Sequence, residues 1–325
     1  MPTLGRSGSQ PKGYVVAVIA AFFLSTTAIF IRYLTLGFGV PALVLALWRD
    51  VFVVVTLIPA LAIARPRLLR VPVRLLPYLA AYGLVLALFN SLWTLSVALN
   101  GAAVATILVY SSGAFTAVLG RLFLKERLGW AKLAAVAMSL GGCALVAGLL
   151  ELGSWKGNLA GVLIGVAGGL SYALYSLFGR SAADRGLDPW TTLVYTFAFA
   201  AFFLFLANCV PDELLPGSPR SLRDILWLAS SWKGWLVLFL LGAIPTVGGF
   251  GLYNVSLSLL PSSVASLVVS LEPVFTAISA YLLLGERLMT VQLAGAALLL
   301  GGVLVLRLFE GRARPARLGL SDRQG

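Results

Sequence analysis

Ten apolar segments of membrane length divide this chain of 325 residues, and they limit its fold more than any other feature. Each has roughly the 17–25 residues that an α-helix needs to cross the hydrocarbon core of a bilayer. The chain is 60% hydrophobic and only 11% charged, a balance that a soluble core does not require. We therefore predict an all-α polytopic membrane protein with ten transmembrane helices. The segments are Tyr14–Leu34, Pro41–Ile63, Leu75–Ala98, Ala102–Leu124, Leu128–Leu150, Leu159–Phe178, Trp190–Val210, Gly234–Leu259, Ser262–Leu284 and Leu288–Leu308.

The second half of the chain repeats the first at an offset of 160 residues. From 101 to 146, 17 of 46 positions are identical to their partners in 261–306, without a gap. Each copy holds five segments, an odd number, so we predict two inverted five-helix repeats, an architecture that recurs in transporters. The predicted organisation is an N-terminal tail (1–13), a first repeat (14–150), a linker (151–158), a second repeat (159–308) and a C-terminal tail (309–325).

Basic residues lie in the connections that a cytoplasmic N-terminus would place inside the cell. Four arginines and no acid occupy the second connection, at 65, 67, 70 and 74, and five arginines follow position 306. The positive-inside rule predicts that both termini are cytoplasmic. We expect a multi-pass protein of the bacterial plasma (inner) membrane. Because these residues are spread over short loops, the net charge of +12 does not indicate nucleic acid as a partner.

Several classes of site lack their sequence signals. The chain has no histidine, and its two cysteines, Cys143 and Cys209, have no metal or redox spacing. No glycine-rich nucleotide motif is present. We therefore expect no cofactor and no metal, and a gradient rather than a nucleotide as the energy source.

Three motifs of the second half carry a family resemblance. They are LEPVF at 271–275, GER at 285–287 and GG at 301–302. With the repeat, they resemble the EamA branch of the drug/metabolite transporter superfamily over residues 14–310. The first half departs from the pattern, with SSG at 111–113 in place of LEP and Lys125 in place of the turn glycine. The resemblance implies a ten-span transporter of small metabolites, since members often export amino acids or amphipathic drugs.

Glu272 lies about ten residues into the ninth segment, close to the expected midplane. A carboxylate at that depth is costly and indicates function by default, either binding a substrate ammonium or handling a coupling proton. The alternative is structural, because Pro273 frees backbone groups that the carboxylate would satisfy.

Two arginines lie within predicted spans. Arg49 is expected to bind a substrate carboxylate or to pair with another helix. Asp50 follows it directly, but neighbours on a helix point about 100° apart, so we expect these two residues to have separate partners. Arg32, near the end of the first segment, is expected to extend to the membrane surface, with substrate contact as the lesser alternative.

Aromatic and polar side chains inside the spans complete the predicted site. Polar groups in a membrane protein face its interior, and aromatic walls with a few polar groups are typical of small-molecule pockets. Ordinary packing is the alternative for each one taken singly. The predicted substrate-binding residues are Trp48, Arg49, Tyr82, Asn90, Trp93, Tyr110, Ser171, Tyr172, Tyr175, Tyr195, Tyr253, Asn254 and Glu272.

Local patterns predict three further features. Proline and glycines at 242–251 predict a hinge or close packing, with freed carbonyls for a ligand as the alternative. The glycine pairs at 141–142 and 301–302 predict close helix contacts, and a homodimer stays open. Residues 218–232 predict an amphipathic helix on the outer surface.

The leading hypothesis is a secondary transporter that works by alternating access about a midplane cavity between the repeats. Its expected partners are a small-molecule substrate and membrane lipid, while proton coupling and exchange both stay open. A membrane-embedded enzyme acting on a lipid-type substrate is an alternative, but the spans offer only Asp50 and Glu272 and no histidine for chemistry. A channel is the other alternative, and no selectivity loop supports it. We predict that the chain is not an enzyme.

Overall fold

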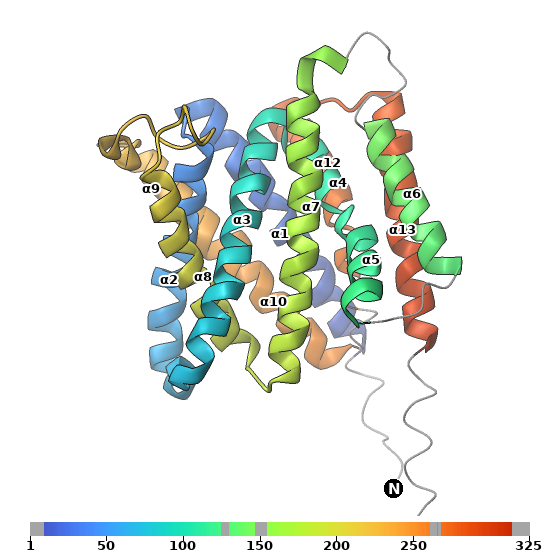
Figure 1. The fold of residues 1–325 in the computed structure, drawn as a ribbon, viewed down its shortest axis with the longest axis horizontal. Coiled ribbons are helices and arrows are strands. Elements are labelled where there is room, and N and C mark those ends of the chain that lie inside the picture. Colours follow the sequence, from blue (N-terminus) through green and yellow to red (C-terminus); the bar gives the residue numbers. More distant parts are fainter. Residues whose placement is uncertain (1–9, 125–129, 147–154, 261–264, 266–267, 314–325) are drawn as a thin grey trace, which may run out of the picture.

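The chain folds into a bundle of helices in a computed structural model that describes residues 10–124, 130–146, 155–260, 265 and 268–313. Within these ranges there is no β-strand. α1 begins and α13 ends at the same end of the bundle, the lower end in Figure 1, and we call the opposite end the far end. The elements are α1 (Gln10–Phe38), α2 (Ala42–Ala64), η1 (Pro66–Leu69), η2 (Val73–Leu75), α3 (Leu76–Asn100), α4 (Ala102–Val109), α5 (Ser112–Leu124), α6 (Trp130–Val146), α7 (Trp155–Asp184), α8 (Pro189–Asn208), η3 (Leu222–Leu226), α9 (Trp232–Leu241), η4 (Gly242–Gly248), α10 (Gly249–Leu259), α12 (Glu272–Leu284) and α13 (Thr290–Ala313).

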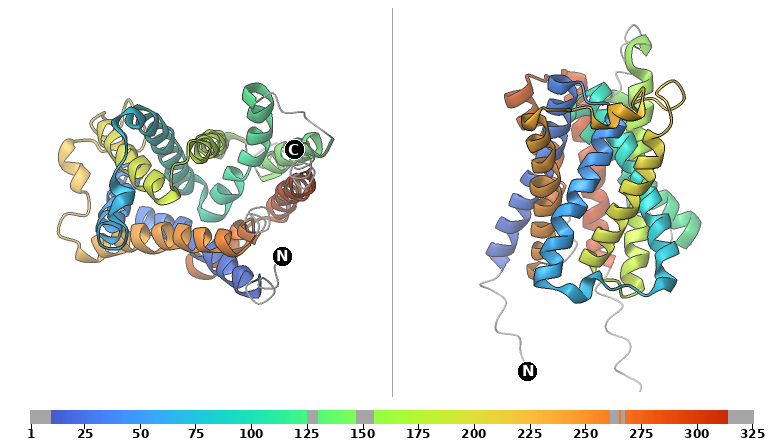
Figure 2. Two further views of the ribbon diagram at one scale, coloured as in Figure 1. Left: turned by 90° about the horizontal axis from the view of Figure 1, so that it is seen from below. Right: turned by 90° about the vertical axis from the view of Figure 1, so that its left-hand side faces the viewer.

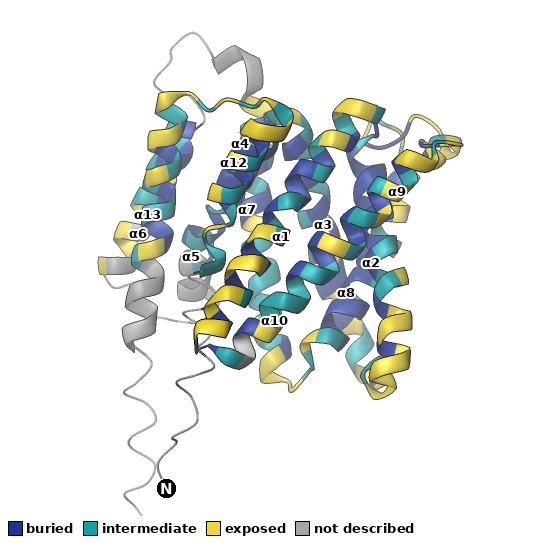
Figure 3. Ribbon diagram, turned by 180° about the vertical axis from the view of Figure 1, so that it is seen from behind, coloured by how far each residue is buried: buried dark blue, intermediate teal, exposed yellow. Residues whose placement is uncertain are grey.

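Six helical stretches are long and apolar enough to cross a membrane. They are Pro11–Phe38, Ala42–Ala64, Val73–Asn100, Leu159–Asp184, Pro189–Asn208 and Trp232–Ser256. Four further apolar helices are shorter, with 10–17 residues in the described part of the chain. Exposed residues on the outward faces include large apolar side chains such as Phe22, Leu88 and Phe202 (Figure 3). An exposed apolar belt of this kind is stable where lipid, rather than water, surrounds the bundle.

The segment predicted as one span over Ala102–Leu124 is broken in the middle. α4 ends at Val109 and α5 begins at Ser112, and the turn between them is closed by a hydrogen bond from the Gly113 N–H to the Tyr110 carbonyl (3.2 Å). Bonds of this i to i−3 type tighten the chain and re-aim the helix that follows.

The second half has a comparable helix start inside a predicted span. α12 begins at Glu272, with Pro273 in its first turn, where a missing N–H leaves no helical hydrogen bond unmade. Residues 262–264 and 266–267 of the predicted ninth span lie outside the described residues.

The proline and glycines of the eighth predicted span form a π-helical turn, η4, between α9 and α10. Pro245 cannot donate to the carbonyl four residues before it, that of Leu241. The Thr246 hydroxyl donates to that carbonyl instead, at 3.0 Å. A Cβ added at Gly242 would lie 3.2 Å from the Arg49 carbonyl, so this stretch also packs closely against α2. The freed carbonyl is satisfied within the helix, which favours the packing interpretation.

α6 and α13 stand together as a pair at one side of the bundle (Figure 2). A Cβ added at Gly142 would lie 2.7 Å from the Gly295 carbonyl, and one added at Gly295 would lie 2.8 Å from the Gly142 carbonyl. Glycines let two backbones approach this closely. The close contact of Gly142 is therefore made within one chain.

The predicted amphipathic helix over 218–232 is wrong. This segment forms turns and a single 3₁₀ helix, η3, which begins with a capping box of Ser221 and Asp224. Two tryptophans anchor the neighbourhood: Trp227 Nε1 donates to the Phe38 carbonyl (2.9 Å), and Trp48 Nε1 donates to the Ile225 carbonyl (2.8 Å). The Ile225 carbonyl that accepts from Trp48 would be bonded within the helix if this segment were a regular α-helix.

Four elements are joined at the far end by one charged cluster. Glu286, between α12 and α13, accepts hydrogen bonds from the N–H groups of Ala102 (3.0 Å) and Ala103 (3.2 Å) at the start of α4. Arg32 Nε of α1 lies 3.3 Å from Glu286 Oε1, and Arg32 Nη1 donates to the Ala98 carbonyl of α3 at 2.5 Å. Arg32 therefore pairs with groups of other elements at this end of the bundle.

Candidate functional site

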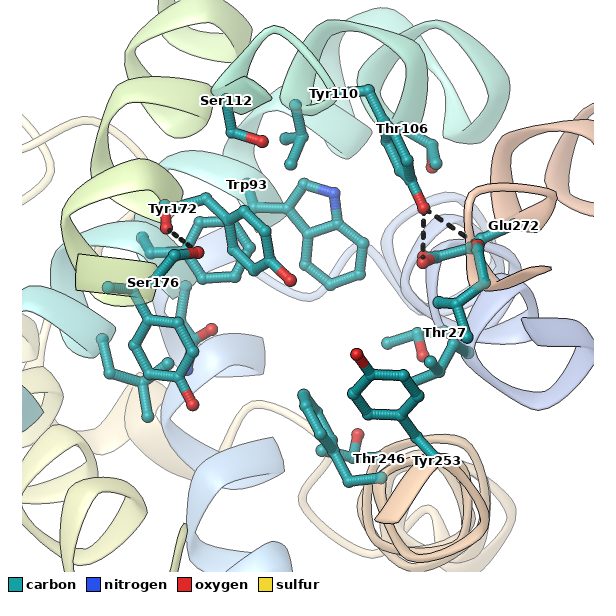
Figure 4. Close-up of a pocket in the computed structure, with 18 of the residues that line it drawn as sticks. Thr27, Trp93, Thr106, Tyr110, Ser112, Tyr172, Ser176, Thr246, Tyr253 and Glu272 are labelled. Atoms are coloured by element: carbon teal, nitrogen blue, oxygen red, sulfur yellow. Dashed lines mark hydrogen bonds between the residues drawn. The ribbon is translucent and has the colours of Figure 1, made fainter. Parts of the chain in front are cut away.

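A cavity of about 350 Å³ lies among the helices, and both halves of the chain line it. Its volume is in the range that holds a small organic molecule. Figure 4 shows side chains from opposite sides pointing into it. The lining residues are Leu24, Thr27, Arg49, Leu86, Phe89, Asn90, Trp93, Thr106, Val109, Tyr110, Ser112, Gly113, Thr116, Tyr172, Tyr175, Ser176, Phe197, Thr246, Phe250, Tyr253, Val269, Ser270, Glu272 and Val303.

The break between α4 and α5 and the start of α12 place polar groups at this cavity. Tyr110, Ser112 and Gly113 line it from the first half, and Ser270 and Glu272 line it from the second half. A continuous apolar helix would have kept its backbone groups paired and its polar side chains few. The interruptions therefore give an apolar bundle a polar interior surface.

Arg49 brings a positive charge to one wall. Its Nε and Nη2 both lie 3.2 Å from Asp50 Oδ1, and Asn90 Nδ2 donates to Asp50 Oδ2 at 2.7 Å. The expectation that Arg49 and Asp50 have separate partners is wrong. Low polarity strengthens the attraction between buried charges, and the long arginine side chain can turn back over the 100° between neighbouring positions.

The rest of the Arg49 side chain is held by an aromatic ring. Its guanidinium carbon lies 5.6 Å from the centre of the Trp93 ring, within the range of a cation–π contact. The Arg49 and Asp50 side chains are 3% and 0% exposed, so both charges are held within the bundle. Arg49 lines the cavity, whereas Asp50 stands behind it and does not.

Glu272 brings a carboxylate to the lining of the same cavity. The Tyr110 hydroxyl donates to Glu272 Oε2 at 3.1 Å and also lies 3.3 Å from the Val269 carbonyl (Figure 4). Glu272 stands in the first turn of α12, where the helix dipole favours a negative charge. The partner described for its side chain is a neutral phenol, and not one of the backbone groups near Pro273.

Aromatic side chains form the wall between the two charged groups. The rings of Phe89 and Trp93 stack with centres 6.0 Å apart, Phe89 lies 5.0 Å from Tyr172, and Tyr172 lies 6.0 Å from Tyr175. Phe250 and Tyr253 of α10 line another side. Such surfaces bind apolar or aromatic groups and, through their faces, cations.

Eight predicted substrate-binding residues are brought together at this cavity. They are Arg49, Asn90, Trp93, Tyr110, Tyr172, Tyr175, Tyr253 and Glu272. They come from α2, α3, the α4–α5 break, α7, α10 and α12.

The other five predicted residues lie outside the lining, and four have partners elsewhere. Trp48 bonds to the surface segment at Ile225, and Tyr82 stacks on Phe178 with ring centres 5.4 Å apart. The Ser171 hydroxyl donates to the Ala167 carbonyl of its own helix at 3.0 Å. The Tyr195 hydroxyl donates to the Leu69 carbonyl at 2.8 Å and holds η1 against α8. Asn254 follows Tyr253 on α10 and is not among the lining residues.

Sequence reasoning missed most of the small polar lining. Thr27, Thr106, Thr116 and Thr246 face the cavity. Threonine is common in membrane helices, where its hydroxyl can bond to the preceding turn, so its presence alone carries no signal. Phe89 had a usable signal, because it stands four residues before Trp93 on the same helix face.

In the part of the chain that the structure describes, no group of three or more acidic, cysteine or histidine residues could hold a metal ion. The charged residues among those described as lining the cavity are one arginine, Arg49, and one glutamate, Glu272. That arrangement suits recognition of a charged organic molecule.

A sequence profile described as the EamA-like transporter family matches residues 11–148 and again residues 159–308. A "probable amino-acid metabolite efflux pump" of Escherichia coli is 28% identical over 283 residues, covering 86% of this chain and 89% of that protein. Its namesake in Salmonella typhimurium is 27% identical over 277 residues, covering 84% of this chain and 88% of that protein.

Two other similarities are more limited. An uncharacterized transporter of Bacillus subtilis is 27% identical over 203 residues, a match that spans 62% of this chain and 61% of that protein. A solved crystal structure, described only as that of a protein, superposes with a TM-score of 0.59 at 18% identity and covers 92% of this chain and 98% of that one. The second similarity shows a shared fold.

Proposed function

Because the chain belongs to the EamA-like transporter family and is a membrane transporter, we propose that it exports small amphipathic metabolites such as amino acids through the cavity described above. The observation that carries this proposal is the pair of charged residues, Arg49 and Glu272, in the lining of one cavity that is otherwise rich in aromatic side chains. An amphipathic metabolite has a charged end and an apolar body, and this cavity offers a surface for each.

The names of the relatives support the direction and the substrate class. Two of them, matched over more than four fifths of their length, are described as amino-acid metabolite efflux pumps. We carry export and amino-acid-like substrates to this chain as part of the proposal.

We further propose ten spans in two inverted repeats, 14–150 and 159–308, that rock about the cavity. Support comes from the family profile, which matches two consecutive stretches with closely similar boundaries. The beginning of α1 and the end of α13 lie on the same side of the bundle, as an even number of crossings requires (Figure 1). Alternating access would open the cavity first to one side and then to the other.

Energy coupling belongs to the same proposal. Glu272 is a carboxylate at the cavity with a neutral hydrogen-bond partner, so it can hold either a proton or an ammonium group. A transporter that exchanges these two cations at one carboxylate would use a proton gradient to move its substrate.

The test is transport by the purified protein in proteoliposomes. A panel of radiolabelled amino acids is offered with and without a pH gradient, and we expect accumulation that responds to the gradient or to substrate on the opposite side. The variant Glu272→Gln should reduce the rate at least ~10-fold, the loss of one charged contact. Arg49→Gln should also reduce the rate, because it leaves the Asp50 carboxylate buried without its cation. Ser171→Ala is the matched control, because Ser171 lies in α7 next to Tyr172 but outside the lining. If neither Glu272→Gln nor Arg49→Gln reduced the transport rate, the assignment of this cavity as the substrate site would be refuted.

A further inference from the structure

The two charges that face the cavity are not equivalent, because only one of them has an opposite charge beside it. Arg49 is held by Asp50, with Nε and Nη2 each 3.2 Å from one carboxylate oxygen. Both side chains are almost fully buried, so water does not screen this pair. The positive charge of Arg49 is largely compensated before any ligand enters.

Glu272 has no such compensation among the described residues. Its hydrogen-bond partner is the phenol of Tyr110, which is neutral, and the two ion pairs of the described chain involve other carboxylates. Arg49 and Glu272 line the cavity, and Asp50 lies behind Arg49. When all three of these described groups are ionised, they carry one negative charge in excess. A buried charge without a counter-charge is costly, and a cation on the ligand removes that cost.

The surroundings of Glu272 suit a cation attached to an aromatic body. Figure 4 shows Thr27 and Tyr253 on the same side of the cavity as Glu272, and Trp93 and Tyr172 across from it. The faces of aromatic rings carry negative potential and attract ammonium groups. The first-half position that aligns with Glu272 is Ser112, which also lines the cavity and carries no charge. The lining therefore offers one acidic group, which matches one ammonium.

From this asymmetry we infer that the cavity recognises its ligand by a single ammonium group next to an aromatic or apolar body, and that a carboxylate on the ligand adds little. The inference rests on the proposed function for the location of the site and narrows its substrate class to aromatic monoamines, with amino acids as members that carry a dispensable carboxylate. Asp50 is then a positioning residue, which fixes Arg49 and cancels its charge.

The experiment compares three probes that differ by one group: L-phenylalanine, phenethylamine, which lacks the carboxylate, and 3-phenylpropionate, which lacks the ammonium. Binding to the purified full-length protein in detergent is measured by isothermal titration calorimetry. We expect phenethylamine to bind within ~3-fold of phenylalanine, and 3-phenylpropionate to bind at least ~10-fold more weakly than both, since a hydrogen-bonded charge contact is lost.

Two variants test the origin of that selectivity. Glu272→Gln should abolish the difference between the amine and the acid. Asp50→Asn removes the charge that compensates Arg49 while keeping an oxygen for Asn90, so it should improve binding of 3-phenylpropionate relative to phenethylamine at least ~10-fold. A melting curve and a size-exclusion profile confirm that each variant is folded, and Ser171→Ala serves as the control with unchanged selectivity.

Several results would overturn the inference. They are equal binding of amine and acid, phenylalanine binding more than ~10-fold tighter than phenethylamine, no binding of any probe, or no shift in the Asp50→Asn variant of a folded protein. The proposed function fails separately: amine-selective binding without movement of any probe in proteoliposomes would leave the inference in place and refute transport of this class.

Discussion

The described part of the chain contains two arginine–carboxylate pairs, which differ in their burial and in the separation of their members along the chain. Arg49 and Asp50 are neighbours on α2, with side chains 3% and 0% exposed. Arg32 and Glu286 are far apart in the chain and join at the far end of the bundle, with side chains 19% and 18% exposed.

The carboxylates of the two pairs also have different second partners. Asp50 accepts from the Asn90 side chain, so its network is made of side chains in one wall of the cavity. Glu286 accepts from the backbone of Ala102 and Ala103, and so caps α4 as well as pairing with Arg32. The first pair orients a charge toward a ligand, whereas the second ties helices together.

This difference indicates that the contribution of an ion pair to the free energy of folding depends mainly on how deeply the pair is buried. Removing one member of a buried pair leaves the other uncompensated, whereas an exposed pair is weakened by solvent and contributes little. The contribution of Glu286 should come chiefly from capping a helix. Four variants of these residues test this ranking.

Asp50→Ala is expected to have the largest effect. It leaves the Arg49 cation buried without its anion, which costs about 3–5 kcal/mol in folding free energy. In a protein of this size we expect the melting temperature in detergent to fall by about 10 °C. Asp50→Asn is the milder control, because its amide oxygen still accepts a hydrogen bond. A melting temperature equal to that of the parent protein would contradict this assignment.

Glu286→Ala should have the second largest effect, about 1–2 kcal/mol, because it removes a helix cap together with a partly exposed ion pair. The melting temperature should fall by a few degrees, measured by the same thermal scan. Glu286→Gln keeps an acceptor oxygen for Ala102 or Ala103 and should lose less. If the two variants lose the same amount, charge rather than capping is the source of the stability.

Arg32→Gln should cost less than about 1 kcal/mol, the usual range for pairs in contact with solvent. The difference in melting temperature between Arg32→Gln and the parent protein should shrink as the salt concentration rises to about 1 M, because the Debye length is then short. Thermal scans in low and high salt measure this. A loss as large as that of Asp50→Ala would show that exposure does not rank the two pairs.

The double variant Arg49→Met/Asp50→Asn should have the smallest effect on stability, near zero. Replacing both members of a buried pair by uncharged side chains of similar size is often neutral, and the amide oxygen introduced at position 50 can still accept from Asn90. The melting temperature of the double variant should therefore lie above that of Asp50→Ala. A double variant less stable than the single one would show that the pair itself stabilises the fold.

Much of the fold was accessible from the sequence because hydropathy and helix length are local properties. Six predicted spans are helices long and apolar enough to cross a membrane, and the family predicted from LEPVF at 271–275 is confirmed by the profile match. The break between α4 and α5, at residues 110–111, was not predicted, because the Ser-Ser-Gly sequence at 111–113 is compatible with a continuous helix. Pro273 gave a signal for the second helix start.

The sequence predicted which types of residue would line the candidate site, but it did not determine which individual residues of those types do so. Intramembrane charges and aromatic residues are rare enough to single out Arg49, Glu272 and Trp93, all of which line the cavity. Tyr195 and Trp48 have the same signals and bond elsewhere, to Leu69 and Ile225. Helical periodicity gives the face on which a side chain lies, but the neighbour that covers this face depends on packing.

The sequence by itself determined that this chain is helical, membrane-embedded and a member of its transporter family, because apolar segment length and motif identity need no tertiary contact. Only the tertiary structure decided the partners of its charges. Asp50 meets Asn90, 40 residues away, and Glu286 meets Ala102, 184 residues away. Such distances along the chain are closed by the packing of whole helices, and in the described part of the chain this packing gives the Glu272 carboxylate the neutral phenol of Tyr110 as its side-chain partner.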